Sequence, residues 1–90
     1  MIVGRQAVAG TLESNDVQVS VAPHGDGLQV EVESIVLAQF GGEIERVARE
    51  VAAEMGVGNA LIRLKDRGAL ECTVRARVET ALRRAREGSA

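Results

Sequence analysis

The sequence predicts a two-layer α+β sandwich, in which a predominantly antiparallel four-stranded sheet carries two helices on one face. Up to Glu33, apolar residues alternate with polar ones, which is the period of half-buried strands. After Glu33, apolar residues recur at intervals of three and four, which is the period of a helix packed on one side. Alternation returns between Asn59 and Lys65 and divides the helical part in two, so the expected order is β-β-β-α-β-α.

The first three strands are expected over residues 6–12, 17–22 and 28–33. In the second of these, three valines alternate with polar residues, as on a strand with one wet face. A short turn rich in Pro and Gly separates the second strand from the third. Because this turn is short, we expect the third strand to run back against the second.

Helices are expected over residues 36–55 and 73–86, with the fourth strand over residues 59–65 between them. The apolar stripe of the first helix is Val36, Phe40, Ile44, Val47, Val51 and Met55, and that of the second is Leu70, Val74, Val78, Ala81, Leu82 and Ala85. We expect Leu70 to Cys72 to be irregular, because a helix that included Cys72 would turn it away from the apolar stripe. Gly41 and Gly42 cost about 1 kcal/mol each inside a helix. They either allow a close approach to the sheet or mark the true start of regular helix.

Composition limits the classes of function. The chain has 90 residues, which predicts a single domain over 1–90, with a net charge of -2 and Phe40 as its one aromatic residue. A chain with neither a basic excess nor aromatic platforms is not expected to bind nucleic acid. One Cys and one His predict neither an internal disulfide nor a metal site. No apolar run approaches the ~20 residues that span a bilayer, and no signal peptide is evident, so we expect a cytoplasmic protein.

Ser14 is the residue of greatest chemical interest. It stands in the run Glu13-Ser14-Asn15-Asp16 between the first two expected strands, where Asn and Asp favour a hairpin turn. A turn serine often serves local hydrogen bonds alone. As a nucleophile it lacks the surrounding elbow motif, and His24 is the one histidine available as a base, so a serine hydrolase is not supported. An exposed hydroxyl that accepts a group from a modifying enzyme fits this position better.

Two runs carry a family resemblance. The run AGTLES at residues 9–14, followed by Asp16, and the run DRGALEC at residues 66–72 resemble the acyl carrier subunit (gamma chain) of citrate lyase. The resemblance implies that Ser14 bears a phosphodiester-linked prosthetic group, 2′-(5″-triphosphoribosyl)-3′-dephospho-CoA. The thiol of that group would hold acetyl and then citryl groups as thioesters.

The resemblance also implies partners and a role. The chain would be a carrier without catalytic residues of its own in a complex that converts citrate to acetate and oxaloacetate. Its partners would be the alpha (acyl transferase) and beta (citryl lyase) subunits of that complex. A prosthetic-group transferase and an acetylating ligase are also implied.

Other interpretations stay open at the level of sequence. A carrier of a malonate decarboxylase-type complex would use the same kind of prosthetic group, and an unmodified small α+β binding or regulatory domain would use none. Cys72 is a rival thiol, but no neighbouring His or Lys is evident in the sequence to activate it. Glu13 and Asp16 resemble a carboxylate pair for acid–base work, although solvated charge that orients the loop or contacts the modifying enzyme is favoured. His24, in a Gly-rich turn, is expected to be a surface loop residue.

Overall fold

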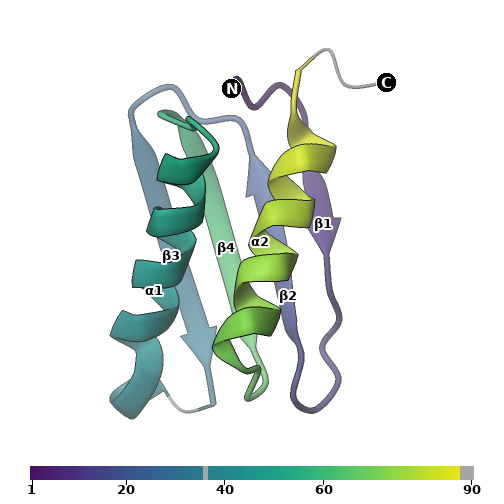
Figure 1. The fold of residues 1–90 in the computed structure, drawn as a ribbon, viewed down its shortest axis with the longest axis vertical. Helices are drawn as coiled ribbons and strands as arrows, with labels where there is room; N and C mark the ends of the chain where they lie inside the picture. Colours follow the sequence, from purple (N-terminus) through teal and green to yellow (C-terminus); the bar gives the residue numbers. More distant parts are fainter. Residues whose placement is uncertain (36, 88–90) are drawn as a thin grey trace.

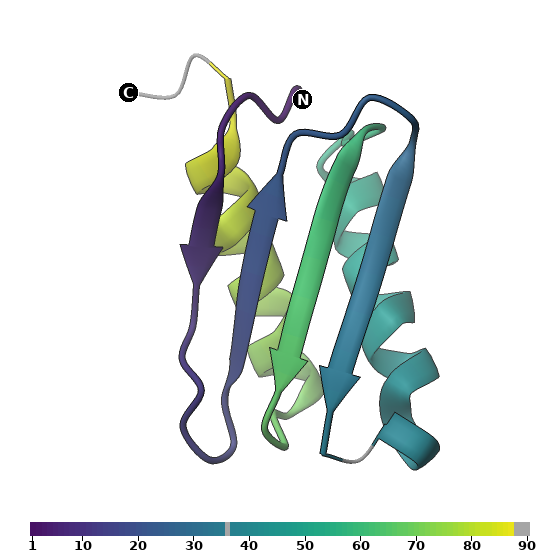
Figure 2. The same cartoon turned by 180° about the vertical axis from the view of Figure 1, so that it is seen from behind.

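Four strands and two helices form two layers (Figure 1). The computed structural model describes residues 1–35 and 37–87, and for residues 37–41 it describes the backbone alone. The elements are β1 (Ala7–Ala9), β2 (Val17–Ala22), β3 (Leu28–Ser34), α1 (Leu37–Glu54), β4 (Ala60–Asp66) and α2 (Glu71–Ala85). Figure 2 shows the sheet from behind, with both helices on its far side; no helix or strand of the described chain covers its near face. The predicted α+β sandwich is confirmed.

Strand β4 occupies the interior of the sheet, whose order is β1-β2-β4-β3. Strand β2 pairs antiparallel with β1 and with β4, whereas β3 pairs parallel with β4. The sheet is therefore mostly antiparallel, as predicted, but the prediction that the third strand lies against the second is wrong. The physical reason is the helix between β3 and β4: α1 carries the chain back along the sheet, so β4 enters in the same direction as β3 and pairs with it.

Burial explains why β4 takes the inner place. Its helix-facing residues Ala60, Ile62 and Leu64 are almost fully buried. The helix-facing residues of β3 are only partly buried, and its alternate residues are exposed. A strand at the edge of the sheet has a neighbouring strand on one side only, so its side chains stay partly exposed to water. The more apolar strand therefore buries more apolar surface at the centre of the sheet.

Two element boundaries differ from the prediction by more than one residue. Strand β1 ends at Ala9 rather than near residue 12. Gly10 has a φ of 84°, and a β-strand cannot continue through a residue with a positive φ. Helix α2 begins at Glu71, so the expectation that Glu71 and Cys72 are irregular is wrong. Leu70 is the extended residue before the helix, and its carbonyl accepts the N–H groups of Thr73 and Val74 at 3.0 Å each. These hydrogen bonds make Leu70 the N-cap residue, and the helix begins at the next residue, Glu71.

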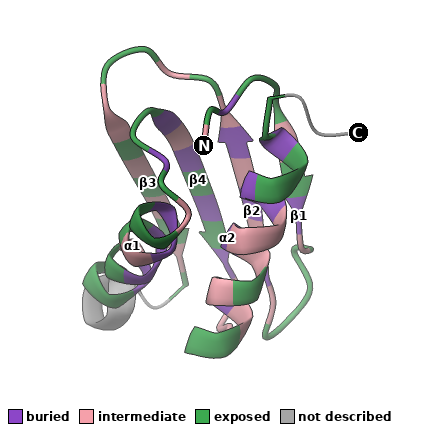
Figure 3. Ribbon diagram, turned by 45° about the horizontal axis from the view of Figure 1, so that its top comes forward, coloured by how far each residue is buried: buried purple, intermediate pink, exposed green. Residues whose placement is uncertain are grey.

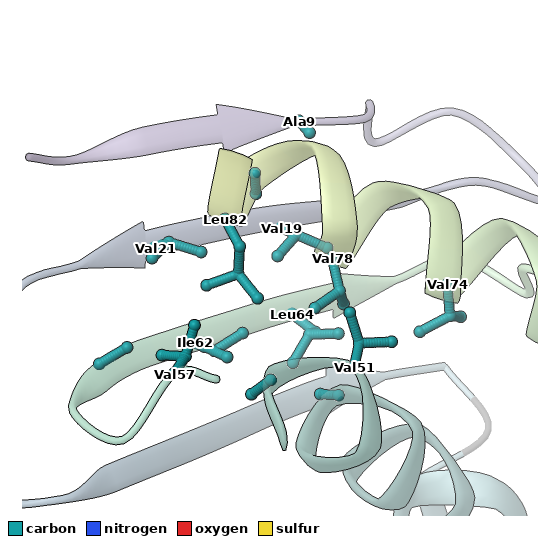
Figure 4. Packing of buried hydrophobic residues seen from close by; sticks show 14 of the residues in the cluster. Ala9, Val19, Val21, Val51, Val57, Ile62, Leu64, Val74, Val78 and Leu82 are labelled. Carbon is teal, nitrogen blue, oxygen red and sulfur yellow. The ribbon is translucent and has the colours of Figure 1, made fainter. Parts of the chain in front are cut away.

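The core lies between the sheet and the two helices (Figure 4). Helix α1 packs over β3, helix α2 packs over β1 and β2, and the helices contact each other. The buried residues of the core are all Ala, Val, Ile or Leu. They are Val3, Ala9, Val17, Val19, Val21, Ile44, Val47, Ala48, Val51, Ala52, Val57, Ala60, Ile62, Leu64, Val74, Val78, Ala81, Leu82 and Ala85.

The predicted apolar stripes are mostly confirmed. Ile44, Val47 and Val51 of α1 are buried, and so are five of the six stripe residues of α2. The exception is Leu70, which is 71% exposed because it precedes the helix. Val36 and the side chain of Phe40 lie outside the described residues. In the described part of the chain, neither helix is long and apolar enough to cross a membrane.

Gly42 lies inside α1, so it does not mark the start of the helix. A methyl group built at Gly42 meets no atom within 4 Å, so no close approach to the sheet requires the glycine either. The side chain position at Gly41 lies outside the described residues. The expectation that these glycines serve a close approach or a helix start is therefore wrong for Gly42, which is simply an exposed helical glycine.

Replacing this residue should stabilise the protein. Gly42→Ala lowers the backbone entropy of the unfolded chain without a clash, so the free energy of unfolding should rise by about 0.5–1 kcal/mol. Urea denaturation of the wild type and the variant measures this difference. An unchanged or lower midpoint would mean that the backbone at Gly42 is not helical.

Candidate functional site

Ser14 stands on the exposed connection between β1 and β2. Figure 3 shows most of this connection in the colour of exposed residues. The N–H of Asp16 donates to the carbonyl of Glu13 at 3.2 Å, so Ser14 and Asn15 are the central residues of a β-turn. Asn15 has a φ of 66°, the left-handed conformation that Asn tolerates better than most residues. Within the described chain the Ser14 hydroxyl makes no hydrogen bond, so it is available to another molecule.

The carboxylate of Asp16 ties this loop to helix α2. Its Oδ2 accepts hydrogen bonds from the backbone N–H and the hydroxyl of Thr11, at 3.1 and 2.7 Å. Its Oδ1 accepts from the N–H of Val17 at 2.7 Å. The guanidinium of Arg77 donates to both oxygens, from Nε at 3.1 Å and from Nη2 at 3.2 Å. The Asp16 side chain is 14% exposed, so the expectation of solvated charge is wrong for this residue, although it does orient the loop.

These contacts also change the acidity of Asp16. The hydroxyl of Thr11 first, then the N–H of Val17 and the guanidinium of Arg77, lower the pKa of the Asp16 carboxyl to about 2. Each donor stabilises the ionised form more than the neutral acid. The carboxylate therefore stays charged, and keeps the loop attached to α2, well into acid solution.

The end of β4 fixes the other side of the Ser14 turn. The N–H of Asn15 donates to the carbonyl of Arg67 at 2.7 Å, and the N–H of Arg67 donates to the carbonyl of Asp16 at 2.9 Å. Asn15 and Asp16 thus both pair with Arg67, as in a β-bulge. Asn15, the first residue of this bulge, has the left-handed conformation. Bulges redirect neighbouring side chains, and here the bulge immediately follows Ser14.

Gly10 allows the two arms of the loop to approach each other. It has a φ of 84°, and a Cβ placed on it would lie 1.9 Å from the carbonyl oxygen of Val17. No side chain fits in that distance. The glycine of the AGTLES run therefore has a structural role, which is to bring the chain before Ser14 against the chain after it.

A buried carboxylate organises the same end of the molecule. Asp66, at the end of β4, is 1% exposed. Its Oδ2 accepts from the hydroxyl of Ser34 at 2.7 Å, and its Oδ1 accepts from the N–H of Ala69 at 2.9 Å. Asp66 therefore joins the ends of β3 and β4 to the loop that leads into α2. Arg67 and Gly68, the next residues, both lie against the Ser14 turn.

An apolar groove of about 510 Å³ adjoins the turn. It lies between α1 and α2, and its lining includes Ile44, Val74, Gly68 and Leu70. Gly68 connects the groove to the turn, because a Cβ built on it would lie 3.6 Å from the Oδ1 of Asn15. Three exposed apolar side chains stand at this end of the molecule, Leu12 at 46%, Ile35 at 67% and Leu70 at 71%.

The other candidate residues are not assembled around Ser14. His24 lies in the β2–β3 connection, at the opposite end of the sheet (Figure 1). Cys72 is an exposed free thiol in the first turn of α2. Glu13 is exposed, whereas Asp16 is engaged by Arg77, so the two do not form an acid–base pair. Sequence reasoning did not single out Arg67 or Arg77 as neighbours of Ser14; for Arg67 the available signal was the DRGALEC run.

Comparison with known proteins shows the family to which this chain belongs. The family model described as "ACP: Malonate decarboxylase delta subunit (MdcD)" matches residues 4–85. A citrate lyase acyl carrier protein of Rhodopseudomonas palustris (strain BisA53) is 49% identical over 85 residues, which are 94% of this chain and 88% of that protein. A citrate lyase acyl carrier protein of Escherichia fergusonii is 51% identical over 88 residues, 97% of this chain and 91% of that protein. The chain belongs to the citrate lyase acyl carrier protein family. The resemblance inferred from the AGTLES and DRGALEC runs is confirmed.

The fold of this acyl carrier family member also occurs in a solved assembly. A chain in the crystal structure of a Pseudomonas malonate decarboxylase hetero-tetramer in complex with malonate superposes with a TM-score of 0.75. The alignment covers 96% of this chain and 93% of that one. At 22% sequence identity, the likeness shows a shared fold.

The titration of Asp16 gives a test of the loop anchor. Its pKa of about 2 in the folded protein lies below the ordinary value of 3.8. The stability that Asp16 contributes is therefore complete above about pH 4 and is lost as the pH falls through about 2. The free energy of unfolding of Asp16→Asn should lie below that of the wild type at pH 6, and the difference should shrink between pH 4 and pH 2.

Urea denaturation at a series of pH values measures this convergence. Ser14→Ala keeps the carboxylate and serves as the control, so its stability should follow the pH dependence of the wild type. Parallel curves for the wild type and Asp16→Asn down to pH 2 would contradict the anchoring role.

Proposed function

We propose that this protein is the acyl carrier subunit of a citrate lyase and that Ser14 is the attachment site of its prosthetic group. The observation that carries the proposal is an exposed serine hydroxyl on a turn held on both sides, in a chain about 50% identical to citrate lyase acyl carrier proteins. The proposed group is 2′-(5″-triphosphoribosyl)-3′-dephospho-CoA, joined to Ser14 through a phosphodiester. Its thiol would carry the acetyl and citryl groups.

The chain presents the hydroxyl but does not activate it. The histidine of this chain lies at the far end of the sheet, and Asp16, a carboxylate of the same turn, is held by Thr11 and Arg77 at a low pKa. A serine hydroxyl is a weak nucleophile near neutral pH without a base. A separate transferase is therefore proposed to deprotonate Ser14 Oγ as the oxygen bonds to a donor phosphorus and the donor's leaving group departs. The carrier itself would be non-catalytic.

The proposed role of the chain is to present an acyl group to the active sites of its partners. A flexible arm anchored at Ser14 would hold its thioester near partner active sites at an effective concentration in the millimolar range. The partners proposed are the alpha (acyl transferase) and beta (citryl lyase) subunits, and an acetylating ligase that loads the thiol. The exposed apolar side chains Leu12, Ile35 and Leu70 beside the arm support contact with such partners. The lone cysteine supports a reducing cytoplasmic location.

A carrier role in a malonate decarboxylase is the second candidate. It is favoured by the description of the matching family model and by the fold of the Pseudomonas chain. Against it stands sequence identity, which is 22% to that chain and close to 50% to the citrate lyase carriers. The two candidates share Ser14 and the prosthetic group, and they differ in the subunits that would bind the carrier.

Substitution of Ser14 tests the attachment site. The wild type and Ser14→Ala are produced with a citrate lyase prosthetic-group transferase and its donor, and intact mass and peptide mapping locate any added mass. The wild type should gain the mass of the group on the peptide that contains Ser14, and Ser14→Ala should gain none. Its stability should change by no more than about 0.5 kcal/mol, because the exposed hydroxyl makes no bond within the described chain.

A matched control is Ser20→Ala, which removes a hydroxyl from the middle of β2. It should be modified like the wild type. A mass on Ser14→Ala, or a wild type labelled at Ser20, Ser34 or Ser89, would refute the assignment. An unmodified wild type would favour the binding or regulatory interpretation.

Cys72 offers a second test, because it is an exposed thiol that competes for the acyl-carrying role. Once the prosthetic group is attached, Cys72→Ser should leave thioester formation and acyl transfer essentially unchanged. Hydroxylamine-sensitive labelling with radioactive acetyl groups measures the thioester directly. Loss of the label in the modified Cys72→Ser protein would place the acyl group on Cys72 instead of on the arm.

A further inference from the structure

We propose that the guanidinium group of Arg67 holds the phosphodiester that attaches the prosthetic group to Ser14. The inference rests on the proposed function, because it requires an anionic phosphate on the Ser14 oxygen. It adds a residue of this chain that binds the group beyond the point of attachment.

The backbone brings Arg67 next to Ser14. Arg67 exchanges hydrogen bonds with Asn15 and Asp16, at 2.7 and 2.9 Å. Hydrogen-bonded partners on antiparallel strands have Cα atoms about 5.5 Å apart, and successive Cα atoms are 3.8 Å apart, so the Cα atoms of Ser14 and Arg67 lie within about 9 Å. An arginine side chain on one side and a phosphorylated serine on the other are long enough to meet across that distance.

The charge of Arg67 is uncompensated. The arginines of the helices are mostly paired: Arg46, Arg49, Arg75, Arg77 and Arg83 each contact a carboxylate. Arg67 forms no such ion pair in the described part of the chain, and its Nη1 donates to the backbone carbonyl of Asp66 at 3.2 Å. That single bond leaves most of the five N–H donors of the guanidinium available.

The nearby carboxylates are occupied elsewhere. Asp16 is held by Arg77 and Thr11, and Asp66 is buried and accepts from Ser34 and Ala69. Neither forms an ion pair with Arg67, whose Nη1 bonds only the carbonyl of Asp66, so the described chain supplies no anion for this cation. A phosphodiester carries one negative charge and two free oxygens in the geometry that a guanidinium fork binds through two parallel hydrogen bonds.

The contact would fix the phosphodiester end of the prosthetic group beside Ser14 while leaving its thiol end free to move. Tethering makes the second interaction intramolecular, so even a weak phosphate contact would be well populated. Because the site is near the surface, the attraction should weaken as salt is added.

The test compares apo and modified forms of the wild type, Arg67→Ala, Arg67→Lys and Arg86→Ala. Arg86 is the matched control, because it is exposed, makes no ion pair in the described chain and lies at the opposite end of α2 from the Ser14 turn (Figure 1). Arg67 takes part in the bulge through its backbone, so its replacement leaves those hydrogen bonds in place. Intact mass establishes first that each form carries the group.

Two readouts other than activity report the contact. Attachment should raise the urea midpoint of the wild type and shift the ³¹P resonance of the diester relative to the free group, and both effects should fall in high salt. Arg67→Ala should lose both effects, Arg67→Lys should keep part of them, and Arg86→Ala should keep them in full. In the wild type alone, the Nε–Hε resonance of Arg67 should move when the group is attached.

The outcomes separate the two proposals. A wild type that remains unmodified by transferase and donor refutes the proposed function, and this inference with it. Modification at Ser14 with the same midpoint and ³¹P changes in Arg67→Ala as in the wild type overturns the inference alone, as does an unmoved Arg67 resonance in the modified wild type.

Discussion

The central position of β4 is the constraint on which the rest of this structure depends. Because β4 pairs antiparallel with β2 and parallel with β3, its final residues reach the end of the sheet where the Ser14 loop and the end of β3 also lie. Asp66 there binds Ser34 of β3, and Arg67 binds the backbone beside Ser14. If β3 were paired with β2 instead, β4 would be an edge strand, and these residues would not converge.

The Ser14 turn combines exposure with a fixed backbone. Turn residues lack partners of their own, so an exposed loop of this length is ordinarily mobile. Here the carboxylate of Asp16 satisfies backbone and hydroxyl donors on both arms and pairs with Arg77 of α2, while the bulge opposite Arg67 fixes the other side. Gly10 permits the close approach that closes the loop. A fixed backbone would suit the proposed attachment site, since an already ordered segment loses little entropy on binding.

The layers also leave one end of the molecule suited to partners. The two helices cover a single face of the sheet, and an apolar groove between them opens beside Gly68, next to the Ser14 turn. Leu12, Ile35 and Leu70 are exposed at this end of the molecule. Large apolar side chains that gather at one place on a small protein mark interaction surfaces. The proposed attachment site at Ser14 and this apolar surface therefore occupy the same end of the molecule.

The sequence by itself determined the fold class, the segments that form strands and helices, the exposed position of Ser14 and the family, because periodicity and turn residues act locally and the AGTLES and DRGALEC runs are contiguous. Only the tertiary structure decided that β4 separates β2 from β3, that Asp16 pairs with Arg77, 61 residues away, and that Arg67 lies against the Ser14 turn. The physical reason is that strand order depends on the competition of whole strands for the buried centre, and distant side chains meet only after that competition is resolved. Local sequence patterns contain neither the strand order nor the contacts between distant side chains.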